Sequence, residues 1–322
     1  MTIASDITVD QTASSAVSPT SPAHPHFRSD LVRWQQLVTP AWLADLLVGR
    51  TVVAAPGKAW CLLEVGCKGF EAFAAAHVPG ASYLDTHQLE GGAYWNKVGD
   101  ADLLQVLLGC GIRHDSTVIL YGQNSIAGAR AAHLMLYAGV RDVRLLEGGL
   151  AGWREAGLPL QAGPGAKQLP ASHFGAAFPG CPHYLVATAE VQSRLLQPNA
   201  AVVSIRTLDE FSGKTSGYSY IAAKGDIAGA HWGRAGDGSD VNSMSAYQRP
   251  DGTMKAAACI TAFWEADGIH PGQHNTFYCG TGWRASEAFF YAWLMGWPQI
   301  SVYDGGWFEW STTVLSSTTA NS

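Results

Sequence analysis

The feature that most constrains the fold of this chain of 322 residues is an internal repeat. The motif LEGGLAGW at residues 146–153 returns as YDGGWFEW at residues 303–310, and the apolar pair Leu120–Tyr121 returns as Phe277–Tyr278. The matched positions are separated by the same number of residues, so this stretch aligns without a gap. An ungapped match at such a long period indicates a duplicated domain. The chain is therefore expected to fold as two similar units.

Within each unit, apolar runs alternate with helical patterns. Residues 60–65 (WCLLEV), 118–121 (VILY) and 143–146 (VRLL) have the composition of buried strands, and residues 127–138 have the pattern of a helix. Strands that alternate with helices at this spacing are typical of parallel sheets. We therefore predict an α/β protein in which each unit is a doubly wound parallel sheet flanked by helices.

Composition along the chain predicts the domain boundaries. A leader rich in Ser, Thr, Ala and Pro opens the chain, and a segment rich in Pro and Gly separates the two units. Segments of these compositions bury too little apolar surface to fold alone. The predicted parts are a disordered leader (1–34), a first domain (35–156), a linker (157–182), a second domain (183–314) and a flexible tail (315–322).

Charge and composition exclude several classes of function. A net charge of −6 and an isoelectric point near 6.0 argue against nucleic acid as a partner. The sequence has no apolar run long enough to span a membrane and no signal peptide at its start, so we expect no membrane partner and a cytoplasmic protein. The six cysteines form no CxxC pair and no zinc-ligand pattern, so no metal, cofactor or disulfide framework is expected.

One cysteine stands in a sequence context suited to chemistry. Cys279 follows the apolar run 275–278, and Gly280, Gly282 and Arg284 lead into a helical pattern. A turn between a strand and a helix points backbone N–H groups at one place, and the helix dipole and Arg284 are expected to favour the thiolate. A thiolate so placed can act as a nucleophile.

The repeat assigns this chemistry to the second unit alone. At the matching places of the first unit, Gly122 replaces Cys279 and Ala127 replaces Arg284. We therefore expect one active site per chain, with the first domain inactive.

These motifs together resemble a known family, the tandem-domain rhodanese-like sulfurtransferases. In the first unit the resemblance rests on Glu64–Val65 and on residues 77–81 (HVPGA) and 146–153. In the second unit it rests on residues 204–206 (SIR), 226–230 (DIAGA) and 303–307. The resemblance covers residues ~35 to ~312. With the loop 279–284 and the insert 213–218 (GKTSGY), it is nearest to multidomain bacterial thiosulfate sulfurtransferases.

The resemblance implies a ping-pong reaction. Cys279 would take the outer sulfur of a donor such as thiosulfate as a persulfide, and a thiophilic acceptor such as cyanide or a thiol would then remove it. A protein that donates or accepts persulfide is a further possible partner. The residues expected to bind the substrate are Gly280, Thr281, Gly282, Trp283, Arg284 and Arg206.

The identity of the donor stays open between two members of the family. Thiosulfate-preferring relatives have two basic residues after the cysteine, where this chain has Gly280 and Thr281. Relatives that use 3-mercaptopyruvate have two arginines where this chain has Glu210 and about Ser219. Their Ser–His–Asp relay is also missing, because His87 and Lys97 stand near the Asp and His positions. Thiosulfate, or an uncharacterised persulfide donor, is the preferred prediction. Whether His87, Trp95 and Lys97 of the first domain line the site is left open.

Two rival functions deserve comparison. Phosphatases of this fold have five residues between cysteine and arginine, whereas only four separate Cys279 from Arg284, and the shorter loop suits sulfur better than phosphate. A relay that passes persulfide to a protein partner without turning over a small donor remains an alternative. A purely redox role is disfavoured because no second cysteine lies near Cys279 in the sequence.

Overall fold

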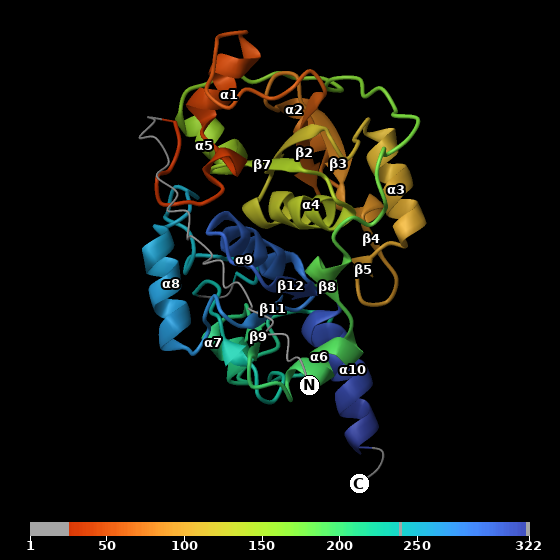
Figure 1. Ribbon diagram of the computed structural model, residues 1–322, viewed down its shortest axis with the longest axis vertical. Helices are drawn as coiled ribbons and strands as arrows, with labels where there is room; N and C mark the ends of the chain where they lie inside the picture. The colour runs from red at the N-terminus through yellow and green to blue at the C-terminus, as the bar shows by residue number, and fades with distance from the viewer. Residues whose placement is uncertain (1–25, 238–239, 320–322) are drawn as a thin grey trace, which may run out of the picture.

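Two five-stranded parallel sheets form the body of the protein (Figure 1). The computed structural model describes residues 26–237 and 240–319. The first sheet has the order β1-β7-β6-β2-β3 and the second the order β8-β12-β11-β9-β10, so strands that correspond in the repeat occupy the same places. Every pairing within these sheets is parallel. The predicted α/β fold with two doubly wound parallel sheets is confirmed.

The strands and helices of each domain alternate along the chain. The strands of the first sheet are β1 (Leu37–Val38), β2 (Trp60–Gly66), β3 (Ser82–Asp85), β6 (Thr117–Gly122) and β7 (Asp142–Leu146). Those of the second are β8 (Leu185–Val186), β9 (Ala200–Ser204), β10 (His231–Trp232), β11 (His274–Tyr278) and β12 (Ile300–Tyr303). A short antiparallel pair, β4 (Glu90–Gly91) and β5 (Asn96–Lys97), stands apart from both sheets.

Helices cover both faces of each sheet. The first domain has α1 (Pro40–Leu47), α2 (Phe70–Ala75), α3 (Asp100–Gly109), α4 (Ser125–Ala138) and α5 (Gly149–Glu155). The second has α6 (Thr188–Arg194), α7 (Leu208–Phe211), α8 (Ala257–Ala266), α9 (Trp283–Leu294) and α10 (Gly306–Thr319). Short 3-10 turns lie at Trp34–Gln36, Thr86–Gln88 and Pro182–Tyr184. Among the residues that the structure describes, we find no helix both long and apolar enough to cross a bilayer.

The two domains meet through α4 and α9, which lie against each other between the two sheets (Figure 1). Each of these helices follows the central strand of its sheet, β6 or β11. Residues 126–138 of α4 and 284–294 of α9 are all buried. A helix that is buried on every side belongs to the centre of a protein. The interface between the domains is therefore part of the main core.

The alternation of side chains along the central strands separates an inner core from two outer ones. In β6, Val118 and Leu120 belong to the core between the sheets, whereas Ile119 and Tyr121 belong to an outer cluster with Trp42. In and just after β11, Phe277 and Cys279 face the inner core and Tyr278 faces the other outer cluster. Successive residues of a strand point to opposite faces. Cys279 therefore faces the first domain.

The segment before the first strand corrects the expected boundary of the leader. Phe27 and Leu31 are buried, the Arg28 guanidinium donates to the carbonyl of Met254 at 2.6 Å, and the Arg33 N–H donates to the carbonyl of Leu294 at 2.9 Å. The prediction of disorder up to residue 34 is therefore wrong for residues 26–34, because this segment packs Phe27 against Trp42 of the first domain and forms hydrogen bonds to the second. Residues 1–25 lie outside the described residues.

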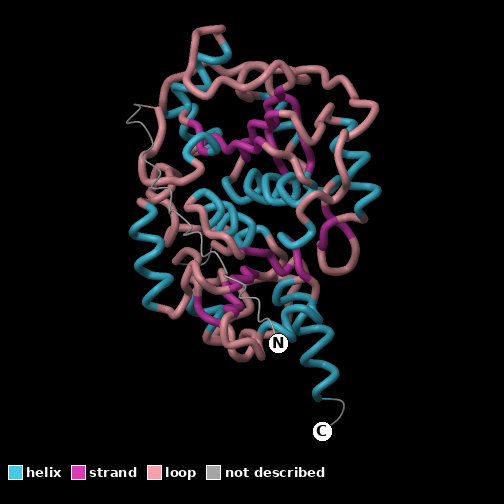
Figure 2. The backbone as a smooth tube through the Cα atoms, in the orientation of Figure 1, coloured by secondary structure: helices cyan, strands magenta, loops and turns pink. Residues whose placement is uncertain are grey.

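The linker and the tail also have defined positions. Residues 157–181 contain no helix or strand beyond one bridging residue, and they cross the first domain as one long loop (Figure 2). Their backbone bonds to it at several points, including a pair of hydrogen bonds between Gln161 and His77 at 2.8 and 2.9 Å. At the other end, α10 extends to Thr319. The prediction of a flexible tail is therefore wrong for residues 315–319, and residues 320–322 lie outside the described residues.

A buried carboxyl group lies at the interface between α4 and α9. The Glu287 carboxyl accepts a hydrogen bond from the Ser125 hydroxyl at 3.2 Å and another from the Gln248 amide. No basic side chain is among its hydrogen-bond partners in the described chain. Burial raises the pKa of Glu287 to about 7. The interface therefore favours the neutral form of this carboxyl group.

We predict that Glu287→Gln stabilises the protein above neutral pH. In the native protein the pKa of Glu287 is about 7, whereas the ordinary pKa of a glutamate side chain, taken for the unfolded state, is 4.5. Between these values the native state binds more protons than the unfolded state, so this group lowers the free energy of unfolding as pH rises. The total loss is about 3 kcal/mol at most. Glutamine cannot ionise, so the variant does not lose this free energy of unfolding as pH rises.

The measurement is urea unfolding of both proteins at about pH 5 and about pH 8. The variant's advantage over the wild type is expected to be larger at the higher pH. Glu265→Gln, at an exposed position of α8, controls for the removal of one carboxylate from the chain. An advantage of Glu287→Gln that is equal at both pH values would contradict the prediction.

Candidate active site

The loop after β11 is held in place by the start of α10. The Trp307 N–H donates to the carbonyl of Cys279 at 2.8 Å, and the Phe308 N–H donates to that of Gly280 at 3.1 Å. Gly306 makes this approach possible, because a Cβ atom there would lie 2.6 Å from both carbonyl oxygens. The close approach of α10 to the loop thus explains why the second domain has a glycine at position 306.

Anchoring the carbonyls sets the direction of the N–H groups in the loop. In a trans peptide the carbonyl and the following N–H point in opposite directions. The N–H groups of Gly280 and Thr281 therefore point away from α10, and that of Gly280 meets the Tyr218 hydroxyl at 3.2 Å. Gly282, with a φ of 91°, then turns the chain into α9. The expected turn between strand and helix, with N–H groups on its inner side, is present.

Arg284 is held by an acidic partner rather than left free. Its two terminal nitrogens donate to the two oxygens of Glu210 at 2.9 Å each, and one also donates to the Tyr218 hydroxyl at 2.6 Å. Burial by itself would raise the pKa of Glu210, but the hydrogen bonds and charge of Arg284 outweigh it and hold that pKa below its ordinary value. The pair is therefore ionised at neutral pH, and the positive charge of Arg284 is matched locally.

Arg206 supports this arrangement from behind. Its guanidinium donates to the carbonyl of Gly225 at 2.6 Å, to Asp226 at 3.1 Å and to the carbonyl of Ser216 at 3.1 Å. The side chain is fully buried and does not line the cavity that contains Cys279. The expectation that Arg206 binds substrate is therefore wrong. Nearby acids take its charge, and it fixes the insert that carries Tyr218.

A cavity of about 570 Å³ lies between the two domains and contains Cys279 in its wall. Of the predicted residues, Thr281, Trp283 and Arg284 also line it, whereas Gly280 and Gly282 shape the loop without lining it. The second domain adds the insert and its neighbourhood (Gly217, Tyr218, Ser219, Tyr220, Val241 and Asn242). The first domain adds the opposite wall (Cys67, Thr86, His87, Glu90, Trp95 and Ile126).

The wall from the first domain shows which of His87, Trp95 and Lys97 line the cavity. His87 and Trp95 line the cavity, and their rings meet edge to face with centroids 5.7 Å apart. Lys97 does not line it, because its ammonium group donates to Asp100 at 2.7 Å. Cys67 and Glu90 were missed by the sequence reasoning. No local motif marks them, since they reach Cys279 only through the packing of one domain on the other.

Buried ion pairs join the two walls behind the loop. The Trp283 indole N–H donates to Glu90 at 2.8 Å, and Arg130 of α4 donates to Glu90 at 2.6 Å. Arg130 also pairs with Asp304 of the second domain. Burial raises the pKa of Glu90, although the charge of Arg130 acts in the opposite direction. The position of Trp283 and the charge of Glu90 thus depend on residues of both domains.

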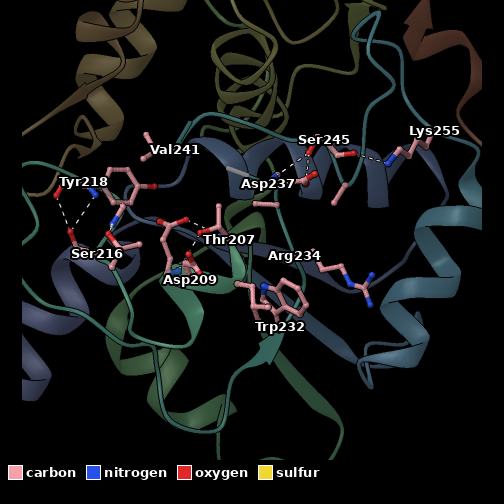
Figure 3. Close-up of a pocket in the computed structure, with 17 residues that line it drawn as sticks. Thr207, Asp209, Ser216, Tyr218, Trp232, Arg234, Asp237, Val241, Ser245 and Lys255 are labelled. Carbon is pink, nitrogen blue, oxygen red and sulfur yellow. Dashed lines mark hydrogen bonds between the residues drawn. The ribbon is translucent and has the colours of Figure 1, made fainter. Parts of the chain in front are cut away.

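A larger cavity of about 960 Å³ lies on the other side of Tyr218 within the second domain (Figure 3). Its polar side chains already bond to one another or to the backbone, as Lys255 does to the carbonyl of Ser245 at 2.6 Å and Ser245 to Asp237 at 2.7 Å. Among the lining residues that the structure describes, none is a cysteine or histidine. We place the candidate active site in the smaller cavity because Cys279, the predicted nucleophile, lies there.

The chain is similar in sequence and in structure to known proteins. The sequence pattern of the rhodanese-like domain matches the chain twice, at residues 40–156 and 187–313. Thiosulfate sulfurtransferase YnjE of Escherichia coli is 49% identical over 282 residues, which are 88% of this chain and 64% of YnjE. The crystal structure of YnjE matches with a TM-score of 0.84 and is covered to 68%. The chain thus spans less than two thirds of the full length of YnjE.

Two further solved structures are similar. One is the anaerobic ergothioneine biosynthesis enzyme from Chlorobium limicola in complex with its substrate, trimethyl histidine (36% identity, TM-score 0.84, 88% of this chain and 70% of that one). The other is EanB with a cysteine persulfide in a tetrahedral intermediate state with ergothioneine (35% identity, TM-score 0.85, 88% and 70%).

We predict that Gly280→Ala disturbs the site through Tyr218. A Cβ atom at Gly280 would lie 2.3 Å from the Cζ atom of the Tyr218 ring, so the ring must move away from Arg284. Overpacking of this kind lowers the free energy of unfolding by about 1–3 kcal/mol. Urea unfolding measures the loss.

Gly272→Ala is the matched control, because Gly272 is exposed and has open space around its Cα atom. It is expected to change the free energy of unfolding by less than about 0.5 kcal/mol. Equal effects of the two substitutions would show that Tyr218 does not constrain the loop.

Proposed function

Because this chain belongs to the family of rhodanese-like domain proteins and contains two such domains, we propose that it is a sulfurtransferase. It moves a sulfane sulfur from thiosulfate or a related donor, through a persulfide on Cys279, to a thiophilic acceptor such as cyanide or a thiol. Similarity to YnjE and to the persulfide-bearing EanB supports this proposal. We further propose that the protein acts in the cytoplasm.

The observation that carries the proposal is the setting of Cys279. The residue is 1% exposed and lies in the wall of a cavity, at the start of a loop in which anchored peptides turn the N–H groups of Gly280 and Thr281 away from α10. Such groups stabilise an anion without any reorganisation during the reaction. They suit both a thiolate and the terminal sulfur of a persulfide.

The reaction has two balanced steps. The Cys279 thiolate attacks the outer sulfur of thiosulfate, the S–S bond of thiosulfate breaks, and sulfite leaves with the electron pair. The acceptor then attacks the outer sulfur of the persulfide, and its S–S bond breaks to return the electron pair to Cys279. The enzyme ends in its starting state, so no external oxidant or reductant is needed.

The charges of the lining side chains affect which sulfur donor can bind in the cavity. Arg284 is the one lysine or arginine among the described lining residues, and Glu210 balances its charge. A carboxylate donor such as 3-mercaptopyruvate therefore finds no unpaired basic side chain to hold it. The same lack of an unpaired cation predicts weak binding of the thiosulfate dianion, so the preference for thiosulfate over 3-mercaptopyruvate rests on the missing Ser–His–Asp relay and arginines rather than on this charge. A high KM for thiosulfate is the expected consequence.

The aromatic lining favours a second candidate acceptor. Trp95, Tyr218, Tyr220 and Trp283 surround a cavity whose acidic member is Glu90. Aromatic faces and an acid suit an organic cation, which aromatic rings attract. Trimethyl histidine is the substrate in the Chlorobium limicola enzyme. A small cationic imidazole is therefore our second candidate for the sulfur acceptor, and a gain of one sulfur atom by trimethyl histidine would support it.

We predict that Cys279→Ser abolishes the formation of thiocyanate from thiosulfate and cyanide. Serine is a far poorer nucleophile toward sulfur and cannot form a persulfide. Thiocyanate is measured colorimetrically over a range of thiosulfate concentrations. Cys259→Ser is the matched control, because Cys259 is exposed and outside the cavity. Equal thiocyanate production by Cys279→Ser and the wild type would overturn the proposal.

Comparison of donors and acceptors tests the finer assignment. The kcat/KM value for thiosulfate is expected to exceed that for 3-mercaptopyruvate, and the reverse order would reassign the donor. Failure with every small donor, together with persulfide uptake from a cysteine desulfurase, would instead identify a protein relay. Hydrolysis of a phosphate monoester by the wild type, lost in Cys279→Ser, would favour the phosphatase alternative.

A further inference from the structure

A second cysteine shares the cavity of Cys279, although the two are far apart in the sequence. Cys67 follows β2 at the carboxyl end of the first sheet, and it lines the wall opposite the loop. The two cysteines differ in access, because Cys67 is exposed whereas Cys279 is 1% exposed. The cavity therefore has one thiol in its interior wall and one open to the surroundings.

An imidazole and a carboxylate accompany the second thiol. The Cys67 sulfur lies 3.8 Å from Nδ1 of His87, and the same nitrogen lies 2.8 Å from an oxygen of Asp85. The other oxygen of Asp85 accepts from the Lys68 N–H at 3.0 Å. Asp85 thus fixes both the imidazole and the turn that carries the cysteine. Lys68 has a φ of 54°, a conformation that residues other than glycine rarely adopt without such support.

The environment of Asp85 favours its anionic form. Burial would raise the pKa of Asp85, but hydrogen bonds from His87 and Lys68 outweigh it and hold that pKa below its ordinary value. An anionic carboxylate can only accept a hydrogen bond, so Nδ1 of His87 carries the hydrogen that lies between the two side chains. The proton of the Cys67 thiol therefore leaves to solvent, to which this residue is exposed, when the nucleophilic thiolate forms.

Access explains why a second thiol is useful. A small acceptor can enter a cavity of about 570 Å³, but a thiol on a folded protein cannot reach a cysteine that is 1% exposed. An exposed thiol on the cavity wall can meet both the interior persulfide and a large partner. We propose that Cys67 takes the sulfane sulfur from the persulfide of Cys279 and presents it to bulky thiol acceptors. This proposal rests on the persulfide of Cys279.

The transfer balances without an external reagent. The Cys67 thiolate attacks the outer sulfur of the Cys279 persulfide and forms a new S–S bond. The bond between that sulfur and Cys279 breaks, and its electron pair returns to the Cys279 thiolate. The proton of the Cys67 thiol passes to solvent, because Nδ1 of His87 already donates to Asp85. One thiol and one persulfide are present before and after, so nothing is oxidised or reduced overall.

The test follows sulfur on each cysteine by mass spectrometry after mixing with thiosulfate and trapping with an alkylating agent. In the wild type we expect sulfur on the Cys279 peptide and then on the Cys67 peptide. In Cys67→Ser we expect it on Cys279 only, and in Cys279→Ser on neither. The Cys259 peptide is the internal control for non-specific exchange, because that thiol is also exposed but lies outside the cavity.

Three results would overturn the inference. The first is a loaded Cys279 with Cys67 unloaded at all times, and the second is equal loading of Cys67 in Cys279→Ser, which would mean direct reaction with the donor. The third is a disulfide between the two cysteines in place of a persulfide on Cys67. Sulfur on neither peptide of the wild type would overturn the proposed function as well, so the two failures are distinguishable.

A second measurement examines acceptor size. Transfer to a thiol on a polymer too large for the cavity is compared with transfer to cyanide. We expect Cys67→Ser to lower the ratio of polymer transfer to cyanide transfer at least about tenfold. Cys259→Ser should leave this ratio as in the wild type. An unchanged ratio in Cys67→Ser would contradict the relay.

Discussion

The arrangement of the site depends on a buried arginine that belongs to the domain without a nucleophile. Arg130 of α4 pairs with Glu90 of its own domain and with Asp304 of the other. Its guanidinium also packs against the loop, since a Cβ atom at Gly282 would lie 3.2 Å from one of its nitrogens. Removing one partner from a buried ion network costs about 3–5 kcal/mol. The first domain therefore helps to determine where the loop from Cys279 to Arg284 lies, which gives it a role despite Gly122 at the cysteine position.

The charged side chains at the site form shared ion pairs with one another before any substrate binds. Glu210 balances Arg284, Asp226 and Glu210 balance Arg206, and Arg130 balances Glu90 and Asp304. A site of this kind holds its shape through ion pairs and offers the ligand mainly backbone N–H groups and aromatic rings. Specificity in it depends on shape and on the developing charge at sulfur rather than on a strong net field.

Much of this fold could be predicted from the sequence, because the repeat and the alternation of strands and helices are local patterns that burial enforces. The loop from Cys279 to Arg284 was also recognisable, since its glycines mark a turn between a strand and a helix. Arg206 was assigned wrongly because its position after a strand does not reveal that Asp226, distant in sequence, takes its charge. Cys67 and Glu90 were missed for a related reason, because they reach the cavity wall only through the packing of the first domain on the second. The packed residues 26–34 could not be foreseen, since their partners near Met254 and Leu294 lie at the other end of the chain.

The central claim is that Cys279 accepts sulfur in a step separate from its transfer to the acceptor. Rapid mixing of the protein with thiosulfate, in the absence of any acceptor, tests this directly through the sulfite released. The account predicts a fast burst of about one sulfite per chain, at most one further equivalent as Cys67 takes the first sulfur, and then no release until an acceptor is added. Sulfite release that requires the acceptor from the start, or an equal burst from Cys279→Ser, would contradict it.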